Sequence, residues 1–162
     1  MRIIGGDWRG RRLFSLKDKR IRPTGGRAKS SLFNMLANSS LYATWPIQGG
    51  TVLDTFAGTG SIGLEFLSRG AAKAFFIDKD QNSLTLLERN IQLLGAEKKA
   101  TVLQKDATSP GHPLVQADLI FLDPPYYLGN ASTLYGADCD LHEPFDHQRL
   151  FNTLKLKENW VL

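Results

Sequence analysis

The tetrapeptide Asp123-Pro124-Pro125-Tyr126 combines residue types that can prepare an exocyclic base amine for attack. Such an amine is a poor nucleophile because its lone pair is delocalised into the ring. A carboxylate and a backbone carbonyl aimed at its two hydrogens stabilise the charge that develops on nitrogen, and Asp123 and Pro124 offer these two acceptors. Consecutive prolines fix the backbone, and Tyr126 offers a face for stacking of a flipped base. The alternative is a Pro-Pro turn that merely ends a strand.

A glycine-rich segment between Asp54 and Gly63 is typical of a turn that binds a nucleotide-like cofactor. Its G-x-G-x-x-G spacing lets the backbone approach a ligand at the end of a strand. The spacing alone does not separate a nicotinamide cofactor from an adenosyl one. Asp54 favours the adenosyl one, because a pyrophosphate repels a neighbouring carboxylate, whereas the cationic methionyl part of S-adenosylmethionine attracts it. Asp54 could instead cap a helix or close the turn.

Two further acids follow predicted strands. Asp78 can accept hydrogen bonds from both ribose hydroxyls, one on each carboxylate oxygen, and Asp106 can accept one from the adenine amine. Each could equally be an ordinary acid in a turn or loop. The expected cofactor-binding residues are Asp54, Phe56, Ala57, Gly58, Gly60, Asp78, Lys79, Asp106 and Ala107.

The chain from residue 51 to residue 122 alternates between apolar strands and helices of amphipathic period. Continuous apolar strands separated by helices are typical of a parallel, doubly wound sheet. Because ligands bind at the carboxyl ends of such strands, we expect the acids and the tetrapeptide to meet at one edge of the sheet. The expected strands are 51–54, 74–78, 101–103 and 119–122, and the expected helices are 62–69 and 80–94.

The first 30 residues are strongly basic, with ten Lys or Arg against two Asp, although the whole chain carries only +4. This asymmetry suggests a basic surface that binds a polyanion. The alternative interpretation is a solvated basic tail. Interleaved aromatic residues favour the former, because disordered arms are poor in aromatics. We expect a hairpin formed by residues 2–4 and 12–14, then a helix over about 27–37 with Thr24 as its N-cap. A last helix is expected over about 147–157.

The composition excludes several classes of protein. The 162 residues, 42% of them hydrophobic, are those of a globular domain. The sequence contains no run of about 18 apolar residues, so it predicts no membrane span. It also lacks the apolar stretch of a signal peptide near its N-terminus. The single Cys139 fits a reducing, cytoplasmic setting, and the scattered histidines lack the spacing of a metal site. We expect a cytoplasmic monomer without a metal.

These segments together resemble the bacterial RsmD family of class I methyltransferases, which methylate the N2 amine of a guanine in small-subunit ribosomal RNA. The resemblance runs from Met1 to Tyr126. Besides the cofactor turn and the tetrapeptide, it rests on Met1-Arg2-Ile3-Ile4-Gly5-Gly6, Arg9-Gly10-Arg11-Arg12-Leu13, Arg22-Pro23-Thr24, Arg27 and Leu32-Phe33-Asn34.

The resemblance implies a Rossmann-like domain over 49–162, preceded by a basic hairpin and a substrate-side helix over 1–48. It implies S-adenosylmethionine as methyl donor and ribosomal RNA or the small-subunit particle as partner. Family members continue with further strands, so it also implies a sheet truncated at its C-terminal edge. Gly26, Lys29 and Ser30 stand where the resemblance leads us to expect Asp, Arg and Glu. The implied RNA-binding residues are Arg2, Arg9, Arg11, Arg12, Arg22, Thr24 and Arg27.

Three alternatives remain at this point. The tetrapeptide also serves methylation of the N6 amine of adenine in DNA or RNA, but Asn is the commoner first residue there, so Asp123 favours guanine. A nicotinamide dehydrogenase would use the same glycine turn. A non-enzymatic RNA-binding domain would use the basic segment alone and would bind no S-adenosylmethionine.

Overall fold

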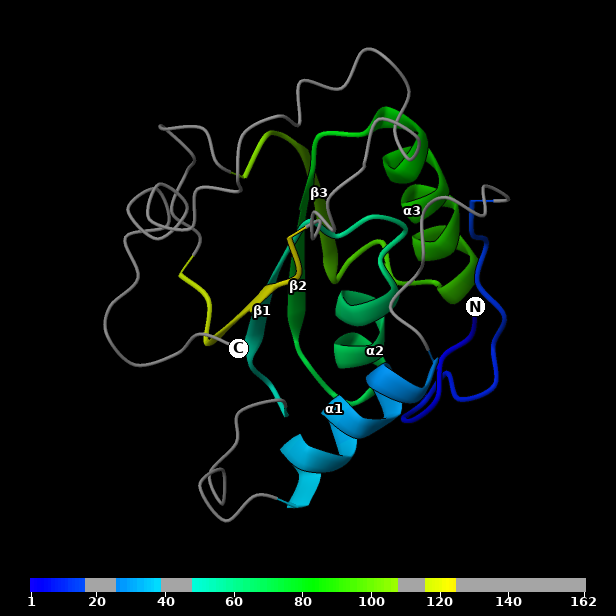
Figure 1. Ribbon diagram of the computed structural model, residues 1–162, viewed down its shortest axis with the longest axis vertical. Helices are drawn as coiled ribbons and strands as arrows, with labels where there is room; N and C mark the ends of the chain where they lie inside the picture. Colours follow the sequence, from blue (N-terminus) through cyan, green and yellow to red (C-terminus); the bar gives the residue numbers. More distant parts are fainter. Residues whose placement is uncertain (17–25, 39–47, 108–115, 125–162) are drawn as a thin grey trace, which may run out of the picture.

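The computed structural model describes residues 1–16, 26–38, 48–107 and 116–124 (Figure 1). In these ranges all four strands pair in parallel, in the order β3-β2-β1-β4. The predicted α/β fold with a parallel sheet is confirmed, and the helix expected over about 147–157 lies outside the described residues. The strands are Thr51–Thr55 (β1), Lys73–Asp78 (β2), Ala100–Gln104 (β3) and Leu119–Leu122 (β4), and the helices are Gly26–Asn38 (α1), Ser61–Ser68 (α2) and Gln81–Leu94 (α3).

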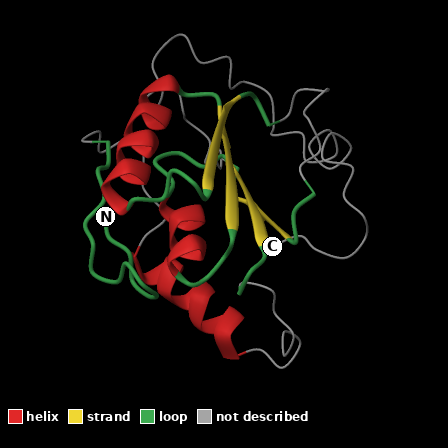
Figure 2. Ribbon diagram, turned by 180° about the vertical axis from the view of Figure 1, so that it is seen from behind, coloured by secondary structure: helices red, strands yellow, loops and turns green. Residues whose placement is uncertain are grey.

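Both faces of the sheet are apolar, because hydrophobic residues follow one another along each strand and alternate between the faces. Figure 2 shows α1, α2 and α3 on one side of the sheet. On that side the strands contribute Val52, Ala74, Phe76, Leu119 and Phe121 to the main core. On the other side a smaller cluster gathers Leu53, Ile77 and Ala107 with Phe75, Ile120 and Leu122.

Helix α3 shows how local sequence fixes an element between two strands. The carboxylate of Asp80 accepts the N–H of Ser83 at 2.8 Å and so caps the first turn. Gly95 ends the helix in the left-handed conformation that a glycine adopts without steric cost. Between these ends, Leu84, Leu87, Ile91 and Leu94 are buried against the sheet at helical spacing.

The N-terminal segment forms the predicted hairpin. Arg2 and Arg12 are antiparallel partners, and the N–H of Ile3 donates to the carbonyl of Arg11 at 3.0 Å. Ile3 and Leu13 are buried in the same core as the sheet, together with Phe33 and Leu36 of α1. The hairpin and α1 therefore pack on the outside of α2, which is buried along its whole length.

The described helices include none with the length and apolarity needed to cross a membrane. Within the same ranges, no group of three or more His, Cys, Asp or Glu side chains is arranged to hold a metal ion. Cys139 lies outside them.

Candidate active site

The carboxyl end of β1 lies between the carboxyl ends of β2 and β4. Thr55 is aligned with Ile77 on one side and with Leu122 on the other. The glycine-rich turn that follows β1 therefore emerges between Asp78, the last residue of β2, and Asp123, which directly follows β4. The prediction that these segments meet at one edge of a parallel sheet is met in the described part of the chain.

The turn itself has an unusual backbone. Phe56 has a φ of 62°, in the left-handed region that a residue with a side chain adopts only at a cost. Gly58 follows with a φ of 55°, and a Cβ added to it would meet no atom of the described residues within 4 Å. The N–H of Ala57 donates to the carbonyl of Ile77 at 2.9 Å, which holds the turn against β2. The backbone at Gly58 is thus open to a ligand, as the glycine spacing predicts.

Asp78 is tied to this turn. Its Oδ2 accepts the N–H of Gly58 at 2.6 Å, and its Oδ1 accepts the N–H of Asp80 at 2.9 Å. Each carboxylate oxygen has two lone pairs, so each keeps one acceptor position beyond these bonds. The carboxylate is half-buried and has the acceptor capacity to bind a pair of ribose hydroxyls.

Asp54 is buried beneath the turn, with 2% of its surface exposed. Its Oδ2 accepts the N–H of Gly63, the third residue of α2, at 2.8 Å. Gly60, at the N-cap of α2, has no side chain for this task, so Asp54 caps the helix from the neighbouring strand. The capping role left open by the sequence is therefore present, and it leaves the other oxygen for further contacts.

The pKa of Asp54 is raised from 3.8 to about 7. Burial is the largest cause, because it removes the carboxylate from water, and the hydrogen bond from Gly63 opposes it. The negative charges of Asp123 and Asp78 raise the pKa of Asp54 further. A cation at this edge of the sheet would relieve their repulsion.

Thr55 is a residue of this site that the sequence did not identify. It is fully buried, and its hydroxyl donates to the carbonyl of Phe121 at 2.8 Å. At the opposite end of the strand pair, Asp118 accepts the N–H of Thr51 at 2.7 Å. The two side chains fix β4 to β1 at both ends. The bond from Thr55 holds Phe121, which lies two residues before Asp123. A lone strand threonine gives no signal for this role, because the role depends on which strand lies beside it.

The remaining predicted cofactor residues differ in exposure: Lys79 is exposed, Asp106 is half-buried, and Ala107 is buried with Leu53 and Ile77. Within the tetrapeptide, Asp123 is half-buried and Pro124 is buried. Pro125 and Tyr126 lie outside the described residues.

Five of the predicted RNA-binding residues are arginines in the described ranges, and all five are exposed: Arg2, Arg9, Arg11, Arg12 and Arg27. Arg22 and Thr24 lie outside these ranges. Lys29 departs from the expectation of an exposed basic segment, because it is 2% exposed and forms an ion pair with Glu65 at 3.2 Å. Burial lowers its pKa, and the charge of Glu65 opposes that effect. Lys29 is therefore part of the interior.

Solved structures with this arrangement define the class of protein. A putative methyltransferase, yhhF, from Escherichia coli superposes with a TM-score of 0.67, at 31% identity, covering 100% of this chain and 75% of that one. A putative methylase from Haemophilus influenzae gives a TM-score of 0.61 at 30% identity, covering 98% of this chain and 74% of that one. The fold is that of the class I methyltransferases.

The chain belongs to the family described as conserved hypothetical protein 95, the RsmD family, whose model matches residues 1–138. It is 37% identical to ribosomal RNA small subunit methyltransferase D of Haemophilus influenzae over 144 residues, 86% of this chain and 71% of that protein. It is 36% identical to the putative rRNA methyltransferase YlbH of Bacillus subtilis over 130 residues, 78% of this chain and 67% of that protein. The resemblance found in the sequence is confirmed.

Proposed function

We propose that this protein transfers a methyl group from S-adenosylmethionine to the exocyclic N2 amine of a guanine in small-subunit ribosomal RNA. The observation that carries the proposal is the position of Asp123 and Pro124, at the end of β4 and directly beside the glycine turn that follows β1. Relatives named as ribosomal RNA methyltransferases support the substrate class. We expect the protein to act in the cytoplasm, as a monomer, on ribosomal RNA or the small-subunit particle.

The residues at this edge fit S-adenosylmethionine better than a dinucleotide. The carboxylates Asp54, Asp78 and Asp123, at the carboxyl ends of three neighbouring strands, favour a cationic ligand and would repel a pyrophosphate. The open backbone at Gly58 accommodates close approach, and Asp78 has two acceptor positions for ribose hydroxyls. When bound, the cofactor supplies an electrophilic methyl group.

The tetrapeptide has the task of orienting the nucleophile. The carboxylate of Asp123 and the carbonyl of Pro124 each accept a hydrogen bond from the amine, which directs its lone pair at the methyl carbon. Tyr126 stacks on the target base. In this transfer the amine nitrogen would bond to the methyl carbon as the carbon–sulfur bond breaks, leaving a neutral thioether, and the proton lost by the amine would pass to solvent. Such a transfer depends on positioning rather than on strong acid or base catalysis.

The exposed arginines of the hairpin and Arg27 are proposed to bind the phosphates of the RNA. Phosphate contacts release counterions, so RNA affinity should fall steeply between about 50 and 200 mM salt. An affinity that stays constant over this range would contradict the proposed role of Arg9, Arg11 and Arg12.

The test is mass spectrometry of nucleosides from unmethylated small-subunit ribosomal RNA treated with the protein and labelled S-adenosylmethionine. We expect label in N2-methylguanosine. The Asp123→Ala variant should lose turnover while calorimetry shows nearly unchanged cofactor binding. Label in N6-methyladenosine would replace the guanine assignment, and an active Asp123→Ala variant would remove the proposed role of this carboxylate. Binding of RNA without any cofactor binding would indicate an RNA-binding module instead.

A further inference from the structure

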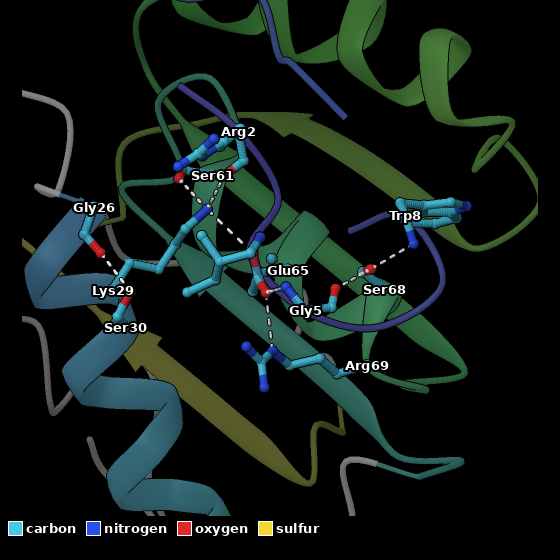
Figure 3. A network of polar contacts seen from close by, with 12 residues as sticks. Arg2, Gly5, Trp8, Gly26, Lys29, Ser30, Ser61, Glu65, Ser68 and Arg69 are labelled. Carbon is cyan, nitrogen blue, oxygen red and sulfur yellow. Dashed lines mark hydrogen bonds and ion pairs between the residues drawn. The ribbon is translucent and has the colours of Figure 1, made fainter. Parts of the chain in front are cut away.

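Helix α2 has a polar stripe on the side that faces away from the sheet. Ser61, Glu65 and Ser68 lie at positions i, i+4 and i+7, which share one face of a helix. All three are buried, although a surface helix would expose such residues. Figure 3 shows that this stripe faces the backbone of the N-terminal hairpin and the side chain of Lys29 from α1.

Glu65 is the centre of this arrangement, with no exposed surface. Its Oε2 accepts the N–H of Ile4 at 2.9 Å, and its Oε1 accepts the N–H of Gly5 at 2.8 Å. Oε1 also accepts the Nε of Arg69 at 2.9 Å, and Oε2 pairs with Lys29 Nζ at 3.2 Å. Two donors on each oxygen use the full acceptor capacity of the carboxylate.

Lys29 and Ser68 extend the same contact to either side. The ammonium of Lys29 donates to the carbonyl of Arg2 at 2.7 Å and to the hydroxyl of Ser61 at 3.4 Å. The hydroxyl of Ser68 donates to the carbonyl of Gly5 at 2.6 Å and accepts the N–H of Trp8 at 3.0 Å. The hairpin backbone is therefore held at several successive residues, whereas its arginine side chains remain exposed.

A buried charge cluster of this kind is weak support for stability alone, because desolvation of the charges offsets most of their attraction. Its distinctive property is geometric, since two adjacent N–H groups must meet two oxygens of one carboxylate. Helix α2 begins at Ser61, directly after the cofactor turn. Any displacement of the hairpin along α2 would therefore change the distance between the exposed arginines and the methyl donor.

We infer that Glu65, paired with Lys29, is a positioning residue that sets where bound RNA lies relative to the methyl donor. This inference rests on the proposed function. The arginines bind the RNA phosphates, and Glu65 determines the location of that bound RNA. Loss of Glu65 should consequently impair turnover more than it impairs RNA affinity, because the arginines remain. Loss of an arginine should have the opposite balance.

The experiment compares Glu65→Gln with the wild-type protein on small-subunit ribosomal RNA, using steady-state methylation and fluorescence anisotropy for RNA binding. Misplacement by about 1 Å can cost up to a hundredfold in rate, so we expect kcat at saturating RNA to fall at least tenfold. The Kd for RNA should change less than about threefold, because phosphate charge contacts dominate nucleic-acid affinity. The Kd for S-adenosylmethionine should also change less than about threefold, since no stripe residue contacts the open side of the turn at Gly58.

Two further variants separate positioning from stability. Leu94→Ala removes a buried side chain of α3 and lowers Tm without altering the stripe, so its kcat should stay near the wild-type value. The double variant Lys29→Met/Glu65→Gln removes both buried charges, so Tm should recover relative to Glu65→Gln. Its kcat should remain low, because one of the two hairpin N–H groups still lacks its carboxylate oxygen.

Three outcomes would overturn the inference. One is an unchanged kcat in Glu65→Gln, and another is an equal fall of kcat in Leu94→Ala. The third is recovery of kcat in parallel with Tm in the double variant. A wild-type protein that methylates no RNA would contradict the proposed function itself, and with it this inference. An active wild-type protein with an equally active Glu65→Gln would contradict the inference alone.

Discussion

Asn90 and Phe14 exchange two hydrogen bonds although they are 76 residues apart. The N–H of Phe14 donates to Asn90 Oδ1 at 2.7 Å, and Asn90 Nδ2 donates to the carbonyl of Phe14 at 3.0 Å. The same amide nitrogen donates to the carbonyl of Thr59, in the cofactor turn, at 3.0 Å. One buried side chain of α3 therefore connects the end of the hairpin to the turn. Together with Glu65, it gives the hairpin two independent attachments to the methyltransferase core.

The first prediction concerns this connection. Asn90→Leu should lower the free energy of unfolding by about 2–5 kcal/mol, because it removes all three hydrogen bonds and leaves backbone groups without their partner. Urea denaturation monitored by circular dichroism measures the change. Asn82→Leu is the matched control, since Asn82 is exposed on the same helix, and it should change stability by about 0.5 kcal/mol or less. Equal losses in both variants would show that the buried amide has no special role.

The second prediction separates two glycines of the turn. Gly58→Ala should cost about 1–2 kcal/mol of stability, because of the left-handed backbone alone. Its new methyl group meets no atom in the part of the chain that the structure describes, so it would extend into the space proposed for the cofactor, and affinity for S-adenosylmethionine should fall at least tenfold. Thermal unfolding and calorimetry measure the two effects.

Gly63→Ala is the counterpart. Its Cβ would clash with the buried ring of Phe76 and lie 3.0 Å from Asp54 Oδ2. We expect a loss of about 1–3 kcal/mol from overpacking and displacement of the Asp54 carboxylate. A Gly58→Ala variant with wild-type affinity for S-adenosylmethionine would contradict the assignment of the turn.

The third prediction follows from the raised pKa of Asp54. The folded protein keeps a proton on this carboxyl up to a pH of about 7, whereas the unfolded chain releases it near its ordinary value of 3.8. The stability contributed by the protonated form is complete below the unfolded pKa and is lost as the pH rises to about 7. Asp54→Asn removes this dependence, so between pH 4 and 7 it should gain stability over the wild type, by on the order of 4 kcal/mol at most.

Denaturant unfolding at several pH values measures the difference between the two proteins. Asp7→Asn, which changes an exposed carboxylate, should retain the wild-type pH profile. A cationic ligand favours the ionised carboxylate, so affinity for S-adenosylmethionine should rise with pH between about 6 and 8 in the wild type and much less in Asp54→Asn. Parallel stability profiles of the wild type and Asp54→Asn would contradict the burial of this charge.

The strands and helices could be predicted because their signals are local. The apolar run at 119–122 and the glycine after Leu94 need no distant partner to be recognised, and the structure has both elements within a residue of the prediction. The common edge of Asp78 and Asp123 followed from the general behaviour of parallel strands. These parts of the site depend on sequence order alone.

The supporting contacts could not be predicted, because each joins residues that are distant in sequence. Glu65 reads as an exposed helix residue until the hairpin, about 60 positions earlier, is known to cover it. Lys29 reads as one more cation of a basic segment until its ion pair with Glu65 is known. In both cases the charge of the side chain is evident from the sequence. Its partner becomes evident only from the packing of the hairpin and α1 on α2.

The last prediction tests Thr55, whose buried hydroxyl donates to the carbonyl of Phe121 at 2.8 Å. Thr55→Val keeps the shape of the side chain and removes the hydroxyl, which leaves a buried carbonyl with one hydrogen bond fewer and should cost about 1–3 kcal/mol. Asp123 lies two residues after Phe121 in the chain. Without this bond its carboxylate should therefore lose its fixed position beside the turn, and kcat should fall about tenfold. Affinity for S-adenosylmethionine should stay within about threefold of the wild type, since the hydroxyl contacts β4 and not the open side of the turn. Thr55→Ser retains the hydroxyl and should retain most of the turnover, whereas a fully active Thr55→Val would show that this hydrogen bond holds β4 without positioning Asp123.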